Sequence, residues 1–222
     1  MLNNNVPLLL LSDIEQYMTI NVGIYIYAEA EVLDFSGPFE VFSTASRVCQ
    51  THRAFNVFLV GESSEMVTAR GGYRVIPSYG FSNHPPIHVL VVAGGVHTSE
   101  LKKSNVIEWI SAIANDASVV ASVCTGAFLL AQAKILDDLN ATTHWEDIGD
   151  LRNSYPNITV HEGKRWIDEG KVITSGGISA GIDMSLHLVG RLHNVELAER
   201  TARQMEFDWT HMPQSSSGGG EC

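Results

Sequence analysis

Basic residues are scarce in this chain, and no cluster of them is present. Lys and Arg number 14 against 25 Asp and Glu, so the formal net charge of the 222 residues is −11. Because a nucleic-acid-binding surface is normally basic, we expect no direct binding of DNA or RNA. The three cysteines, Cys49, Cys124 and Cys222, follow no disulfide or metal spacing. This usage is typical of reduced thiols, and it predicts a cytoplasmic protein.

Long apolar runs are also absent. The apolar segment 8–11 is far shorter than the roughly 20 residues of a membrane-spanning helix, and it lacks the basic start and cleavage site of a signal peptide. We therefore expect no membrane partner. No His-x-x-x-His pair or carboxylate cluster has the spacing of metal ligands, and no Gly-x-Gly-x-x-Gly follows the first predicted strand. We expect neither a metal nor another cofactor.

The composition, with 45% hydrophobic residues, predicts one globular domain with short appendages. Residues 1–17 are predicted to be an N-terminal extension, and the domain is predicted to span 18–210. Residues 211–222 are rich in Ser and Gly, which predicts a flexible tail.

Strands and helices alternate along the predicted domain. The predicted strands are 20–27, 55–60, 87–92 and 119–123, with hairpins over 66–76 and 165–174. The predicted helices are one that opens at Gly37-Pro38, then 101–114, 125–133, 145–155, 179–192 and 195–208. This order predicts an α/β fold with an open, doubly wound, mostly parallel sheet and helices on both faces. Sites in such sheets lie at the carboxyl ends of the strands, which here are followed by Asp34, Gly94-Gly95, Cys124-Thr125 and 176–183.

Cys124 stands between a buried strand and a helix, with Ser122 two residues before it and Gly126 two residues after. Small residues at these positions are typical of a nucleophile elbow, which needs room for its sharp turn. A helix N-terminus favours the thiolate, so this position predicts an activated nucleophile. The alternative is a buried structural cysteine, because free cysteines are among the most buried residues.

Three further groups are candidates for the same site. Backbone N–H groups of Gly94, Gly95 and Thr125 are predicted to form an oxyanion hole, unless the glycines only mark a tight turn. Asp34 is predicted either to contact the thiol and activate water or to cap the following helix. His144 is the natural base for a cysteine hydrolase. The alternative is that His144 occurs here by chance, because the chain contains nine histidines.

Five segments occur in an order that resembles the ThiJ/PfpI superfamily, whose members have a class I glutamine-amidotransferase-like, flavodoxin-type fold. They are Asp34–Phe42, Val91–Gly95, Ala121–Ala131, Ala141–Trp145 and Gly177–Asp183. The resemblance covers about residues 20–209 and implies that Cys124 is the elbow nucleophile. It also implies a homodimer, to which Phe39 and Phe42 are candidates to contribute.

Branches of the superfamily differ beside the cysteine. Thr125 stands where PfpI-type proteases carry histidine, so we do not expect protease activity. The combination of Asp34, Cys124-Thr125 and Gly177–Asp183 resembles the isonitrile hydratase branch, in which the matching aspartate, cysteine and threonine act on the substrate. The resemblance implies that Asp34, Cys124 and Thr125 are catalytic here, with Gly94, His144, Ile178 and Asp183 near the pocket.

The implied reaction adds water to an isonitrile and yields an N-substituted formamide, through attack of the Cys124 sulfur on the terminal carbon. The same motifs also resemble the amidotransferase-like sensor domain of AraC-type transcriptional regulators, which bind an effector without catalysis. A third possibility is an oxidation sensor, because a thiolate in a pocket is easily oxidised. The sequence leaves these alternatives, and the substrate, open.

Overall fold

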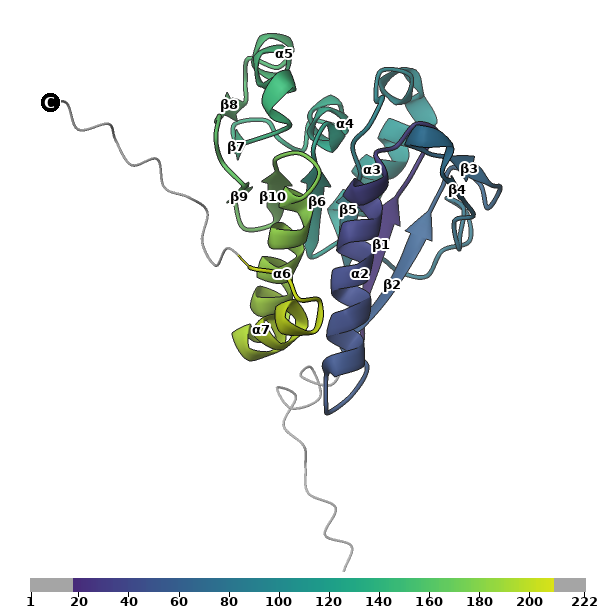
Figure 1. The fold of residues 1–222 in the computed structure, drawn as a ribbon. Helices are drawn as coiled ribbons and strands as arrows, with labels where there is room; N and C mark the ends of the chain where they lie inside the picture. The colour runs from purple at the N-terminus through teal and green to yellow at the C-terminus, as the bar shows by residue number, and fades with distance from the viewer. Residues whose placement is uncertain (1–17, 210–222) are drawn as a thin grey trace, which may run out of the picture.

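The computed structural model describes residues 18–209. The predicted extension 1–17 and tail 211–222 lie outside the described residues. Six strands form the central sheet in the order β2-β1-β5-β6-β10-β9 (Figure 1). Their bounds are β1 Ile20–Tyr25, β2 Phe55–Val60, β5 Val89–Val92, β6 Val119–Val123, β9 Trp166–Asp168 and β10 Val172–Ser175.

All neighbouring strands of this sheet are parallel except the edge strand β9, which is antiparallel to β10. This confirms the predicted mostly parallel sheet and the predicted hairpin that ends it. Every residue of β5 and β6 is buried, as expected for apolar strands covered on both faces. The chain passes from β1 outward to β2 and then returns to β5 on the other side, so the topological switch point lies between β1 and β5.

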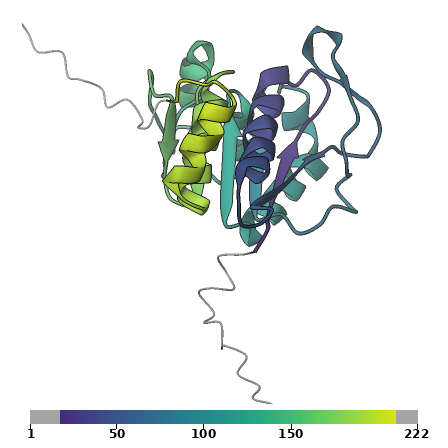
Figure 2. The ribbon, with the colours of Figure 1, turned by 60° about the horizontal axis from the view of Figure 1, so that its bottom comes forward.

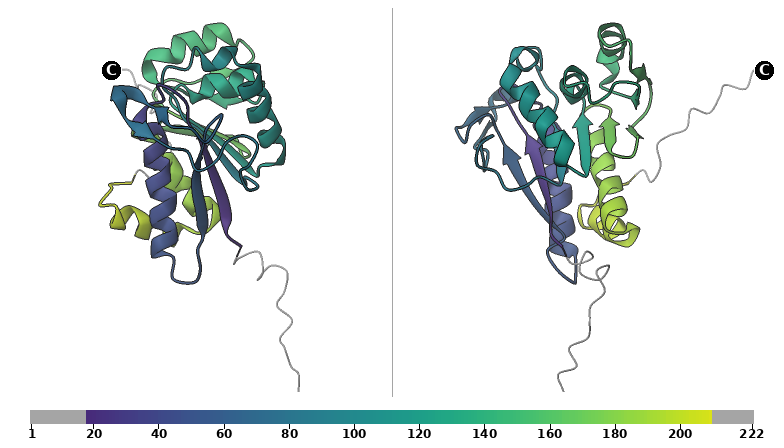
Figure 3. Two further views of the ribbon diagram at one scale, coloured as in Figure 1. Left: turned by 90° about the vertical axis from the view of Figure 1, so that its right-hand side faces the viewer. Right: turned by 180° about the vertical axis from the view of Figure 1, so that it is seen from behind.

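Helices cover both faces of the sheet (Figures 2 and 3). On one face lie α2 Val32–Val48, α6 Ala180–Leu192 and α7 Val195–Gln204, and on the other lie α3 Ser104–Asp116 and α4 Gly126–Gln132. A smaller unit beyond the carboxyl ends of the strands contains α5 Ile148–Ser154 and the parallel pair β7 Asn140–Ala141 and β8 Thr159–Val160. None of the helices among the described residues is long and apolar enough to cross a membrane.

Helix α2 begins one and a half turns earlier than predicted. The prediction of a start at Gly37-Pro38 was wrong, because both residues lie inside the helix. An interior proline costs a helix about 3 kcal/mol. Tight packing offsets this cost: a Cβ atom on Gly37 would lie 3.0 Å from Ile182 of α6. The early start places Asp34 in the first turn, where its side chain is fully buried.

A hairpin excursion follows β2, as predicted. Its strands β3 Val67–Thr68 and β4 Arg74–Val75 are antiparallel and are joined through a 3₁₀ turn at Arg70–Gly72. The helix predicted over 101–114 is divided into a 3₁₀ turn, Glu100–Lys102, and the helix α3.

Candidate active site

The turn from β6 into α4 is a nucleophile elbow. Cys124 has a φ of 57°, in the left-handed region that a non-glycine residue adopts at a cost of about 1–3 kcal/mol. A Cβ atom on Gly126 would collide with the backbone carbonyl of Val92, which explains the glycine at that position. The Cys124 backbone is held from both sides, because its N–H donates to the carbonyls of Ser175 and Gly176 and its carbonyl accepts from the Thr143 hydroxyl. This geometry fits the predicted elbow.

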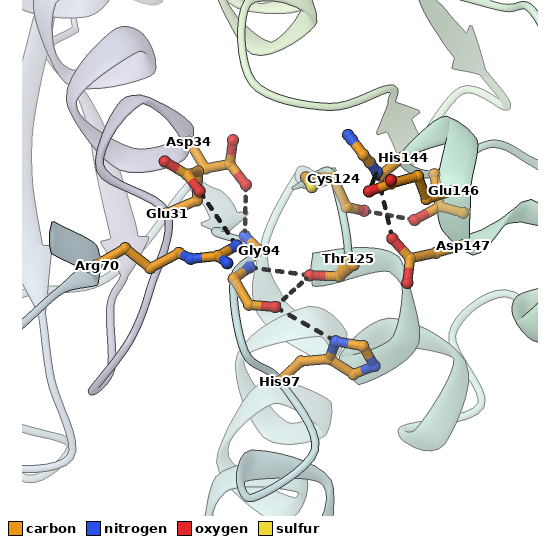
Figure 4. Close-up of polar contacts among 12 residues, drawn as sticks. Glu31, Asp34, Arg70, Gly94, His97, Cys124, Thr125, His144, Glu146 and Asp147 are labelled. Carbon is orange, nitrogen blue, oxygen red and sulfur yellow. Dashed lines mark hydrogen bonds and ion pairs between the residues drawn. The ribbon is translucent and has the colours of Figure 1, made fainter.

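Three of the predicted site residues meet at Gly94, which directly follows β5. A Cβ atom at Gly94 would lie 2.6 Å from the backbone nitrogen of Thr125, 2.7 Å from Oδ2 of Asp34 and 2.8 Å from Cβ of Cys124. The N–H of Gly94 donates to Oδ2 of Asp34 at 3.1 Å (Figure 4). The switch point of the sheet therefore brings Asp34, Cys124 and Thr125 together around one glycine.

Thr125 and Gly95 are joined by two hydrogen bonds. The N–H of Gly95 donates to Oγ1 of Thr125, and the Thr125 hydroxyl donates to the Gly95 carbonyl, both at 2.9 Å. The N–H of Gly95, one of the predicted oxyanion-hole donors, is thus engaged by Thr125, whereas the N–H of Thr125 lies beside the sulfur of Cys124.

Burial changes the acidity of both central groups. Burial, reinforced by the negative charge of Glu31, raises the pKa of Asp34 to about 7, although the Cys124 thiol and the amides of Gly94 and Ile178 act to lower it. Burial and the nearby Asp34 carboxylate raise the pKa of Cys124 well above its ordinary value, although the N–H of Thr125 acts to lower it. The expected lowering of the Cys124 pKa at the start of α4 is therefore reversed, because desolvation outweighs the helix terminus.

Each of these two groups affects the pKa of the other. At neutral pH the sulfur holds its proton, and the Asp34 carboxyl lies close to its own titration midpoint. An acid or base whose pKa lies near the working pH is best suited to transfer protons. Asp34 can therefore accept the thiol proton as a nucleophilic attack begins and pass it to a reacting atom.

A cavity of about 290 Å³ opens onto Cys124. Its wall combines residues that follow β1, β5, β6 and β10 with residues of the β3–β4 hairpin and of the 3₁₀ turn Trp145–Asp147, which precedes α5. The lining residues are Glu31, Arg70, Gly95, Val96, His97, Thr98, Cys124, Thr125, His144, Glu146, Asp147 and Ile178. The volume suits a small molecule.

His144 lines this cavity, as predicted, but its ring faces acidic side chains. Its Nδ1 lies 3.4 Å from Oδ2 of Asp147 and 3.7 Å from Oε2 of Glu146. The ring is packed so closely on Gly177 that a Cβ atom there would overlap it. Within residues 18–209, no hydrogen bond joins His144 to Cys124. His144 is placed to contact a ligand rather than to take the proton of the thiol.

Two other predicted pocket residues differ in their placement. Ile178 lines the cavity with a φ of 55°, a rare conformation for a β-branched residue, and its amide acts on Asp34. Asp183 was expected near the pocket, but it is absent from the cavity wall and its buried carboxylate pairs with Arg165. Asp183 lies in the first turn of α6, and its partner Arg165 directly precedes β9.

Several wall residues were not predicted. The guanidinium of Arg70, on the β3–β4 hairpin, pairs with Glu31 at 3.4 Å at the cavity wall. Nδ1 of His97 donates to the Gly95 carbonyl over 3.4 Å, and the ring packs on Phe128 with ring centroids 4.4 Å apart. Burial lowers the pKa of His97. Glu31 lies three residues before Asp34, and this short separation was a sequence signal for its place in the wall.

Comparison with protein families matches residues 21–191 to the DJ-1/PfpI family. Isonitrile hydratase of Pseudomonas putida is 31% identical over 191 residues, which cover 86% of this chain and 79% of that protein. The transcriptional regulator GbdR of Pseudomonas aeruginosa is 32% identical over 142 residues, which cover 64% of this chain and 38% of the regulator. The chain thus matches well under half of the regulator's length.

Among solved structures, a ThiJ/PfpI family protein from Pseudomonas syringae superposes with a TM-score of 0.77 and 23% identity, covering 93% of this chain and 81% of that one. At this identity the likeness concerns the fold.

Proposed function

Because the chain belongs to the DJ-1/PfpI family, we propose that it is a cofactor-independent hydratase in which Cys124 attacks a small electrophile, with an isonitrile as the substrate class. Membership in this family confirms the resemblance that the five sequence motifs indicated. The observation that carries the proposal is the meeting of Asp34, Cys124 and Thr125 at Gly94. The relation to isonitrile hydratase supports the choice of substrate.

The proposed reaction begins with the thiol of Cys124 and the carboxylate of Asp34. Asp34 takes the proton from sulfur, and the thiolate forms a C–S bond to the terminal carbon of the isonitrile. Asp34 returns the proton to that same carbon, which gives a thioimidate, Cys–S–CH=N–R. The raised pKa values suit this order, because the thiol is deprotonated only as the bond forms and Asp34 is a strong enough base to help.

Water then completes the reaction. Asp34, again a carboxylate, deprotonates a water molecule that adds to the thioimidate carbon, and the nitrogen gains a proton. Collapse of this intermediate forms the C=O bond, breaks the C–S bond and releases R–NH–CHO and the thiol. The N–H of Thr125 beside the sulfur stabilises the negative charge that develops as the C–S bond breaks. Removal of one such donor typically slows a reaction about 10²–10³-fold.

A second candidate function is a sensor domain that binds its ligand without turnover. Two observations favour it: the raised pKa of Cys124 keeps the thiol protonated, and the N–H of Gly95 is occupied by Thr125. The relation to the regulator GbdR adds support. Under this hypothesis the cavity of about 290 Å³ would hold a small effector.

Turnover separates the two candidates. The purified protein is incubated with cyclohexyl isocyanide, and the N-substituted formamide is measured by chromatography for the wild type, Cys124→Ala and Asp34→Asn. The hydratase proposal expects formamide from the wild type and none above background from either variant. Unchanged isocyanide with the wild type would favour the sensor, whose small ligands calorimetry would then identify.

We further propose that the protein is an intracellular homodimer whose interface lies beside the cavity. The cavity residues Val96 and Ile178 are 43% and 40% exposed, and Trp145, between His144 and Glu146, is 72% exposed. Phe42 was named as an interface candidate, but it is fully buried against Phe55 and is unavailable. Light scattering of the wild type and Trp145→Ser tests the dimer, which the variant is expected to weaken.

A further inference from the structure

A second cluster of reactive side chains lies at the end of the sheet opposite to Cys124. Cys49 directly follows α2, His52 lies in the loop between α2 and β2, and His193 joins α6 to α7. Because β2 is parallel to its neighbour β1, the loop that precedes β2 lies at the amino ends of the strands, whereas Cys124 follows the carboxyl end of β6. The cluster therefore lies at the lower end of the molecule in Figure 1, where α2 ends and α6 turns into α7.

The three residues have the spacing of metal ligands. One ligand atom from each lies within 4.8 Å of the other two. The Cys49 sulfur is 3.8 Å from Nε2 of His193, and the rings of His52 and His193 are stacked with centroids 5.7 Å apart. Two ligand atoms bound to a tetrahedral zinc ion lie roughly 3.3–3.8 Å apart, given bond lengths of about 2.0–2.3 Å. Only small side-chain movements are thus needed to bind an ion.

We propose that Cys49, His52 and His193 form a zinc-binding site that is separate from the candidate active site. One thiolate and two neutral imidazoles are ligands that zinc prefers over magnesium or calcium, which prefer oxygen. All three residues are half-buried, so water can reach the ion and complete a tetrahedral set of four ligands. The site joins the α2–β2 loop to the α6–α7 turn, and an ion there would cross-link the two segments.

Neighbouring groups orient two of these ligands. Oγ1 of Thr51 lies 2.9 Å from Nδ1 of His52 and 3.5 Å from the Cys49 sulfur. Thr51 thus contacts both the His52 ring and the Cys49 sulfur, and such outer hydrogen bonds are usual for metal-binding histidines.

Asn194 opposes zinc binding in a way that can be tested. Its Oδ1 accepts from the N–H of Leu197 and caps α7, which directs its Nδ2 to Nδ1 of His193 at 2.8 Å. In this arrangement His193 carries its proton on Nε2, the nitrogen that faces Cys49. Zinc needs that nitrogen deprotonated and the proton on Nδ1. An aspartate at 194 would cap α7 with one oxygen and accept from Nδ1–H with the other, so Asn194→Asp should strengthen the site.

Because Asn194 holds His193 in the tautomer that zinc does not bind, we expect a zinc affinity that is moderate in the wild type and higher in Asn194→Asp.

Cobalt(II), a spectroscopic substitute for zinc, tests the proposal with the whole reduced, metal-free chain. The wild type should give a thiolate-to-cobalt charge-transfer band that zinc displaces. Cys49→Ser should lose the band and at least tenfold in zinc affinity, whereas Cys124→Ala should keep both. Asn194→Asp should bind zinc about tenfold more tightly. Zinc at a hundredfold its Kd should raise the thermal unfolding midpoint by roughly 5–10 °C, and this shift should vanish in Cys49→Ser.

Two results would overturn the proposal: no thiolate band in the wild type at millimolar cobalt, or a band that survives Cys49→Ser and so arises from another cysteine. Circular dichroism of Cys49→Ser verifies that it is folded. If it is not, Asn194→Asp decides, because tighter zinc binding supports the site and unchanged or weaker binding contradicts it.

Discussion

Thr125 and Gly95 hold each other by two hydrogen bonds of 2.9 Å, one in each direction between the threonine hydroxyl and the glycine backbone. This contact joins the start of α4 to the loop after β5, the two segments that flank the Cys124 sulfur. It also engages the N–H of Gly95, one of the backbone donors that the sequence predicted for an oxyanion hole. Thr125 is therefore a positioning residue for the loop as well as the source of the N–H beside the sulfur.

Thr125→Val should be destabilising, whereas Thr125→Ser should be nearly neutral. Valine keeps the shape but removes the hydroxyl, which leaves the N–H of Gly95 without its acceptor and costs about 1–3 kcal/mol. Serine keeps both hydrogen bonds. Urea denaturation measures the free energy of unfolding of each variant. Equal stabilities for the two variants would show that the hydroxyl does not hold the loop.

Gly94→Ala should remove activity and reduce stability. The added Cβ would lie less than 3 Å from Thr125, Asp34 and Cys124, and relief of such overlaps costs typically 1–3 kcal/mol. Gly149→Ala is the matched control, because nothing lies within 4 Å of a Cβ atom at that position in α5. The control should gain up to about 1 kcal/mol from better helix propensity and keep full activity. Full activity in Gly94→Ala would contradict the proposed convergence of the site.

The pH dependence of turnover should have an acidic limb near the pKa of Asp34, which is about 7. Below that pH the carboxyl is protonated and cannot accept the thiol proton, so kcat/KM should fall tenfold per pH unit. Glu31 contributes to the raised pKa, so Glu31→Gln should move the limb to lower pH. A pH-rate profile of both proteins measures this. If the acidic limb lies at the same pH in Glu31→Gln as in the wild type, the limb arises from a group other than Asp34.

Stability should decrease as the pH rises from about 4 to about 7. Folded Asp34 keeps its proton up to about pH 7, against an ordinary value of 3.8, so between these limits the folded state binds more protons than the unfolded state. The contribution of Asp34 to the free energy of unfolding is fully present below the ordinary pKa and is lost as the pH rises through the folded pKa. The loss is at most about 4 kcal/mol.

Asp34→Asn should remove this decrease, because the amide does not titrate and its oxygen can still accept from Gly94. The difference in free energy of unfolding between variant and wild type, measured by urea denaturation at pH 5 and pH 8, should favour the variant more at pH 8. A difference that is the same at both values would show that Asp34 has an ordinary pKa.

Local sequence patterns were sufficient for the elbow and the sheet. The buried runs of β5 and β6, the small residues around Cys124 and the glycines after β5 each reflect a constraint within a few residues. The start of α2 was missed because packing against Ile182, far away in sequence, outweighs the local effect of Pro38. Local propensity cannot report such a contact.

The cavity wall depends on placements that no local pattern encodes. Arg70 reaches the site because the β3–β4 hairpin folds back toward Glu31, and Asp147 enters through a short 3₁₀ turn. The pKa of Cys124 was predicted in the wrong direction for a similar reason. The sequence shows the helix that follows the cysteine, but not the burial or the buried carboxylate beside it.

Cys124 and Asp34 are proposed to act together on a small electrophile, and intact-protein mass spectrometry during turnover of cyclohexyl isocyanide measures the covalent step. We expect a transient adduct, heavier by the mass of one isocyanide, on Cys124 in the wild type, with formamide appearing as it decays, and no adduct in Cys124→Ala. Formamide production that persists in Cys124→Ala, or a wild type that forms neither adduct nor product, would contradict this proposal.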